Sequence, residues 1–65
     1  MNITPNLQLI LDKAEDVLGG KDKANDWIEH TSATLGDSPR NLSETAEGTI
    51  AVLLHLSAIS RHSHQ

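Results

Sequence analysis

The chain contains no cysteine, no phenylalanine, no tyrosine and only one tryptophan among its 65 residues. The absence of cysteine excludes disulfide bridges and zinc sites with cysteine ligands. A core without other aromatic residues must consist mainly of Leu, Ile, Val and Ala. A domain of this length also buries a smaller share of its surface than a larger one. Because the usual reinforcements of a small fold are missing, association with another protein or another copy is favoured.

Basic residues are scarce as well: five Lys and Arg stand against nine Asp and Glu, a formal net charge of -4. This balance argues against a protein that binds nucleic acid by neutralising phosphates. No apolar run is long enough to span a membrane, and the N-terminus lacks a cationic and then apolar signal. We therefore expect a cytoplasmic protein that contacts neither nucleic acid nor membranes directly.

The segment TPNLQLILDKAEDVLGG at the start of the chain predicts a helix. Thr4 suits the N-cap and Pro5 the first helical position, where a missing N–H costs nothing. Apolar residues recur at intervals of three and four along the segment, as on one face of a helix. Gly19 and Gly20 should end the helix, because glycine reaches the left-handed conformation without steric cost.

The middle of the chain is rich in turn residues around the single tryptophan. We expect a short helix over residues 22–30 and a further one of about one turn opened by Ser38-Pro39. Trp27 is interpreted as a core anchor, and Gly48 as a point where another backbone packs closely, with a partner contact as the alternative for each. The expected structural anchors are Trp27, Leu35, Gly36, Pro39, Leu42 and Gly48.

The last helix should run from about residue 45 to 61, and its apolar residues are too numerous for a single stripe. One face carries Ala46, Ile50, Leu53 and Leu54, and the other carries Val52, Leu56 and Ile59. We expect one face to pack on the first helix and the other to meet another chain, because so small a domain cannot easily cover both. The predicted fold is all-α, a single domain over residues 1–65 in which two longer helices flank two short ones, with a flexible tail at 62–65.

No pattern of catalytic residues is visible. The chain has no nucleophile elbow, P-loop or dinucleotide fingerprint, and the acids of its first half interleave with lysines as on a solvated surface. His55 and His62 lie seven residues apart, but metal ligands usually recur four apart on a helix or come from two elements. We therefore expect no enzyme, no metal site and no cofactor, and interpret the histidine-rich end as an exposed tail.

The order of residues in the middle of the chain resembles a known family. Ahead of the final helix stand Ala24, Trp27-Ile28, Leu35-Gly36, Pro39, Leu42, Thr45 and Gly48. This order and spacing resembles the toxin-binding domain at the C-terminal end of the MbcA/ParS/Xre group of bacterial antitoxins, over roughly residues 7–62. Two features depart from the family: Thr31-Ser32 replaces a common Pro-Asn pair, and the first helix begins so soon after Met1 that a preceding DNA-binding domain is not expected.

The resemblance implies a helical domain that binds and neutralises a toxin, typically a RES-domain enzyme that consumes NAD. In this family the C-terminal helix and tail typically cover or enter the toxin's active-site cleft. The predicted partner-binding residues are therefore Val52, Leu56, Ile59, Arg61 and His62. The alternatives are a stand-alone dimerisation or adaptor module with a different protein partner and, less favoured, a metal-dependent function of the histidine-rich tail. A homo-oligomer is expected in addition to the toxin complex.

Overall fold

The computed structural model describes residues 4–63, with the backbone alone at positions 62 and 63. Within these residues the chain forms four α-helices and no strand. The helices are α1 (Pro5–Leu18), α2 (Lys21–Glu29), α3 (Pro39–Leu42) and α4 (Ala46–Ser63). Two longer helices thus flank two short ones, and the predicted all-α class is confirmed. None of these helices is both long enough and apolar enough to cross a membrane.

Both ends of α1 follow from local sequence. The Thr4 hydroxyl accepts a hydrogen bond from the Leu7 N–H at 3.2 Å, and Pro5 occupies the first turn. At the other end Gly19 has φ +91°, and the N–H groups of Gly19 and Gly20 both donate to the carbonyl of Glu15, at 3.0 and 3.1 Å. These bonds satisfy a carbonyl that has no partner within the helix. The chain therefore turns at once into α2.

The connection from α2 to α4 is held by side-chain caps. Gly36 has φ +86°, as expected for the turn. The Ser38 hydroxyl accepts from the Asn41 N–H at 3.3 Å and so caps α3, although α3 has only four residues. The Thr45 hydroxyl accepts from the Gly48 N–H at 2.9 Å at the start of α4. Helix α4 ends at Ser63, two residues later than expected, and the rest of the predicted tail lies outside the described residues.

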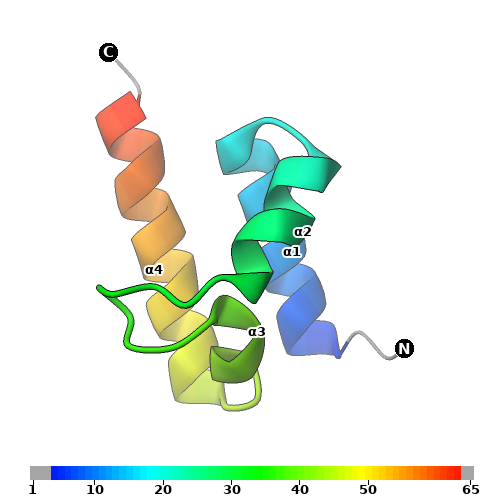
Figure 1. The fold of residues 1–65 in the computed structure, drawn as a ribbon, viewed down its shortest axis with the longest axis vertical. Helices are drawn as coiled ribbons and strands as arrows, with labels where there is room; N and C mark the ends of the chain where they lie inside the picture. The colour runs from blue at the N-terminus through cyan, green and yellow to red at the C-terminus, as the bar shows by residue number, and fades with distance from the viewer. Residues whose placement is uncertain (1–3, 64–65) are drawn as a thin grey trace.

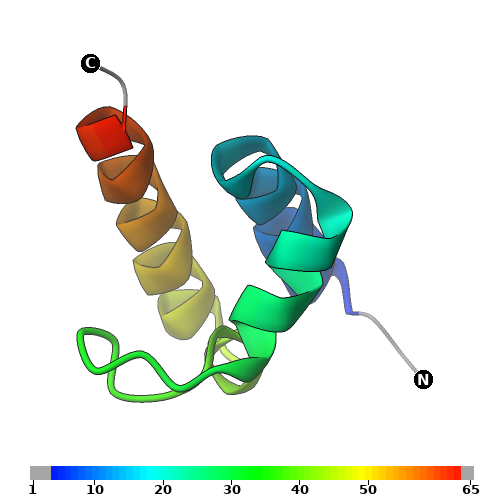
Figure 2. The same cartoon turned by 45° about the horizontal axis from the view of Figure 1, so that its top comes forward.

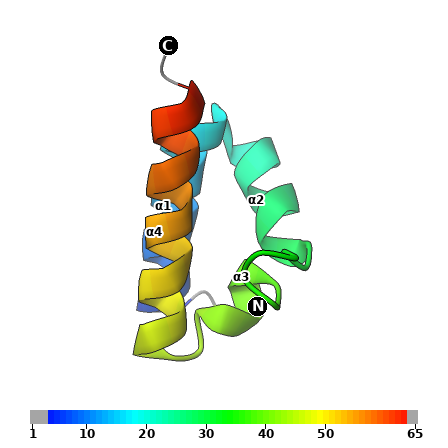
Figure 3. The ribbon, with the colours of Figure 1, turned by 90° about the vertical axis from the view of Figure 1, so that its left-hand side faces the viewer.

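The core lies where α1 meets its two neighbours. Helix α1 packs against both α2 and α4, and α3 packs against α2 and α4 (Figures 1 and 3). Figure 2 shows α4 along one side of the molecule, with α1 and α2 along the other. The fully buried apolar residues are Leu7, Ile10, Ala14, Ala24, Ile28, Val52 and Leu56. Because α4 has neighbours on only part of its circumference, a long side of this helix remains in contact with solvent.

Candidate protein-binding surface on the last helix

The structure decides which face of α4 is buried. Val52 and Leu56 have no exposed surface, and both belong to the core cluster. Ile50 and Leu54 are 57% and 66% exposed. The expectation that the face of Val52 and Leu56 meets another chain is therefore wrong for the folded domain, because these side chains are covered by the protein's own core.

A physical reason for this choice can be found in the residues at the ends of each face. The exposed face begins at Glu47 and ends at Arg61, both of which are exposed. Burying that face would remove two charged side chains from water without a partner of opposite charge among the residues that the structure describes, which is costly. The buried face carries the hydroxyl of Thr49 instead, which donates to the carbonyl oxygens of Thr45 and Ser43 at 2.8 and 3.3 Å. Its polar group is thus satisfied inside the domain.

The other predicted partner-binding residues lie at the end of α4. Ile59 is half-buried and packs against the core. Arg61 is exposed and open to a partner. The side chain of His62 lies outside the described residues. Of the five predicted residues, the structure therefore leaves Arg61 fully accessible and Ile59 partly so.

Trp27 is half-buried against the core, and it meets a partner that the sequence did not reveal. Its ring stacks on that of His55 with centroids 6.3 Å apart and an angle of 13° between the planes. This contact joins α2 to α4 across the domain. The two residues are far apart in the chain, so no local pattern could have indicated the pair.

The remaining anchors lie in the connection that leads from α2 into α4 and in the first turn of α4. Pro39 is buried, and Leu35 and Leu42 are half-buried against the core. A β-carbon placed on Gly48 would collide with the carbonyl oxygen of Leu42 and lie 2.9 Å from its carbonyl carbon. Glycine is therefore required where the last turn of α3 crosses the first turn of α4. The interpretation of Gly48 as a point of close backbone packing is confirmed.

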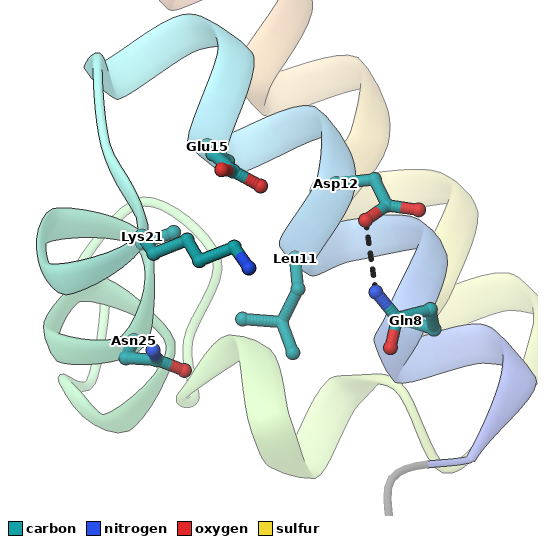
Figure 4. A pocket seen from close by; sticks show the side chains of 7 residues that line it. Gln8, Leu11, Asp12, Glu15, Lys21 and Asn25 are labelled. Carbon is teal, nitrogen blue, oxygen red and sulfur yellow. Dashed lines mark hydrogen bonds between the residues drawn. The ribbon is translucent and has the colours of Figure 1, made fainter.

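An open groove of about 330 Å³ lies between α1 and α2 (Figure 4). It is lined by Gln8, Leu11, Asp12, Glu15, Lys21, Ala24 and Asn25. The Gln8 side-chain amide donates to the carboxylate of Asp12 at 2.8 Å along its rim. In Figure 4 the Lys21 side chain extends from α2 toward Glu15 and Leu11 of α1. The groove contains no nucleophile with an adjacent base, so its geometry supports no specific reaction.

No group of three or more metal-ligating side chains that could hold an ion occurs among the residues that the structure describes. His64 and the side chain of His62 lie outside them. The features that remain for function are on α4: an exposed apolar face, with an exposed arginine at its C-terminal end. A helical domain of this kind, with large apolar side chains left in solvent, is typical of protein-binding modules.

A comparison with known protein families identifies the kind of protein-binding domain. The model of the antitoxin Xre/MbcA/ParS C-terminal toxin-binding domain matches residues 13–60, and the chain belongs to this family. The resemblance seen in the sequence is thereby confirmed, and a protein toxin is the partner that the family implies. The matched region runs from the middle of α1 almost to the end of α4. No curated protein and no solved structure matches the chain.

Proposed function

We propose that the domain neutralises a RES-type, NAD-consuming toxin by packing the end of α4 and the residues that follow it against the toxin's active site. The observation that carries this proposal is the family match over residues 13–60. The matched region includes five of the seven fully buried core residues, the capped turns between α2 and α4, and most of α4. The proposal assigns no catalytic group and no cofactor to this chain. It places the protein in the bacterial cytoplasm, where a toxin that consumes NAD would find its substrate.

The chemistry at the end of α4 supports this assignment. Arg61 is exposed, and no acid occurs after Glu47 in the sequence. An accessible guanidinium can form two parallel hydrogen bonds with a carboxylate of a partner. Such a charged pair contributes about 1.5–3 kcal/mol when it is shielded from water. Arg61 is thus the described residue best suited to fix the domain on an acidic site.

The test uses a RES-type toxin encoded beside this chain, with NAD consumption and complex formation as the two readouts. Deletion of residues 61–65 and the variant Arg61→Glu should each weaken inhibition by at least about tenfold, the factor that corresponds to 1.4 kcal/mol. Lys23→Glu is the matched control, since Lys23 is an exposed cation on α2. It should inhibit like the wild-type domain.

Full inhibition by the domain lacking residues 61–65 would overturn the role of the helix end. Binding to the toxin without any inhibition would show that the contact lies away from the active site. A domain that binds no RES-type toxin but captures another protein through α4 would favour the second candidate, an adaptor module. That candidate is supported by the exposure of Ile50 and Leu54.

A further inference from the structure

The exposed residues of α4 form a single stripe along the helix. Apart from Ala46 at the start of the helix, the exposed residues among those whose side chains the structure describes are Glu47, Ile50, Ala51, Leu54, Ala58 and Arg61. At about 100° of rotation per residue they fall within a sector of roughly 100°. The four residues between the two charged ends are all apolar. We call these six residues the exposed stripe.

Five of the six residues of the exposed stripe form a pattern that is complementary to its own reverse, and only Ala51 has no counterpart, because its mirror position is the half-buried Ser57. Leu54 is its midpoint, because Glu47 precedes it by seven residues and Arg61 follows it by seven. Ile50 and Ala58 are likewise each four residues from the midpoint. Reversing the stripe about Leu54 therefore exchanges an acid with a base and a large apolar residue with a small one.

We propose that α4 pairs with α4 of a second copy of this chain in an antiparallel arrangement, with the twofold axis at Leu54. In this dimer the two Leu54 side chains meet on the axis. Ile50 of each copy lies over Ala58 of the other, and Glu47 lies beside Arg61. A twofold interface brings each surface patch against the same patch of the other copy, so a stripe with this symmetry satisfies both copies at once.

Packing and charge both favour this arrangement over its alternatives. A small residue opposite a large one lets two helices approach to the usual 8–10 Å between axes. A parallel pair would instead place Glu47 beside Glu47 and Arg61 beside Arg61. Like charges so placed repel, whereas the antiparallel pair forms two opposite-charge contacts at its ends. These exposed pairs determine the orientation more than the affinity, which depends on Ile50 and Leu54.

The dimer goes beyond the proposed toxin contact and rests on different observations. The exposed stripe centres on the middle of α4, whereas the proposed toxin contact lies at the last turn and the residues after it. Only Arg61 belongs to both. An interface of one short helix from each copy is small, so we expect weak association, in the micromolar range. All tests therefore use the isolated full chain over a range of concentrations.

Sedimentation equilibrium provides the first test. The wild-type chain should show a reversible monomer–dimer equilibrium, and Leu54→Glu should be monomeric because two carboxylates would meet on the axis. Leu9→Glu is the matched control: Leu9 is 55% exposed on α1, so the dimer should persist. A chain that stays monomeric up to millimolar concentration would overturn the proposal, and so would a dimer that survives Leu54→Glu.

Charge exchange tests the orientation. Glu47→Arg and Arg61→Glu should each weaken dimerisation several-fold, and the double variant should restore it, because each arginine again faces a glutamate. A parallel dimer predicts no such rescue, since the double variant would only exchange its like-charge pairs. The double variant is not expected to regain toxin binding. Loss of the dimer and loss of the toxin contact are therefore distinguishable.

The absence of native cysteine allows a third test. Leu54→Cys should form a disulfide-linked dimer under mild oxidation, because residues on the axis come within disulfide range. Glu47→Cys alone should not, while a mixture of Glu47→Cys and Arg61→Cys chains should form the mixed dimer. Leu9→Cys reports the rate of random collision. Faster crosslinking of Glu47→Cys than of Leu54→Cys would contradict the antiparallel arrangement.

Discussion

The two faces of α4 have nearly the same apolar character, yet one is core and the other is surface. Val52 and Leu56 are completely covered, while Ile50 and Leu54 remain 57% and 66% exposed. The difference lies in the polar groups that each face carries. The fully buried polar residue of α4 is Thr49, whose hydroxyl is hydrogen-bonded within the domain. The exposed face carries Glu47 and Arg61, which have no partner of opposite charge on α1.

Because of this difference, we expect one face of α4 to determine the stability of the domain and the other face to be available for binding. Residues on the buried face hold α4 against α1, and changes there should act on the free energy of unfolding. Residues on the exposed face contribute little to the fold of one chain and are available to a partner. The four predictions below compare the two faces, and each can be measured by urea denaturation followed by far-UV circular dichroism. The measurements are made at concentrations where the chain is monomeric.

The largest contrast is expected between two leucines only two positions apart. Leu56→Ala should lower the free energy of unfolding by about 2–5 kcal/mol, because it leaves a cavity in the core. Leu54→Ala should change it by no more than about 0.5 kcal/mol. In a domain this small the first change removes much of the folded population at 25 °C. Equal effects of the two substitutions would mean that the faces are not distinct.

Gly48 should reverse the usual ranking of glycine and alanine in a helix. Helix propensity alone predicts that Gly48→Ala stabilises by up to about 1 kcal/mol. The collision with the Leu42 carbonyl should instead make it destabilising by about 1–3 kcal/mol. The matched control, Ala51→Gly on the exposed face, should cost about 1 kcal/mol from propensity. If Gly48→Ala instead stabilised the domain, α3 and α4 would be able to move apart without a cost in the free energy of unfolding.

Thr49→Val tests the fully buried polar group of α4. The substitution keeps the shape and removes a hydroxyl that donates to two carbonyl oxygens. We expect a loss of about 1 kcal/mol, the typical net contribution of such a hydrogen bond. The opposite change on the exposed face, Ile50→Thr, should leave stability within about 0.5 kcal/mol of wild type. If Thr49→Val left the free energy of unfolding unchanged, the buried face would be stabilised by apolar packing alone.

The smallest effect is expected on the flank between the faces. His55→Ala removes the ring that stacks on Trp27 and should cost about 0.5–1 kcal/mol. His55→Phe keeps an aromatic ring and should recover most of that loss. The emission of Trp27 reports the contact directly, since it is the only tryptophan in the chain. An emission spectrum unchanged by His55→Ala would mean that the rings are not in contact in solution.

Features with a local cause were predictable from the sequence. The Thr4 cap, the Gly19 turn, the Ser38-Pro39 start of α3 and the requirement for glycine at position 48 all appear in the structure as expected. Each depends on interactions within a few residues, so the sequence nearby contains the necessary information. The order of these signals was also sufficient to indicate the antitoxin family.

Which face of α4 is exposed was not predictable in the same way. Apolar periodicity showed that the helix had two apolar faces, but both Val52 and Ile50 fit a core position equally well. The stack of Trp27 on His55 was missed because the two residues are brought together only by the path of the chain through α3. The charged residues at the two ends of the exposed stripe were visible in the sequence. In the structure they mark the exposed face of α4 better than apolar periodicity does.

The sequence by itself determined the four helices, the capped ends of α1, the start of α3, the all-α class and the family. These depend on backbone conformation, capping and the order of short-range signals. Only the tertiary structure decided that Val52 and Leu56 face inward and Ile50 and Leu54 outward. That choice depends on how α4 packs against α1 and α3, which brings together residues far apart in the sequence. A small rotation of α4 about its axis would exchange core and surface, and no local pattern specifies that rotation.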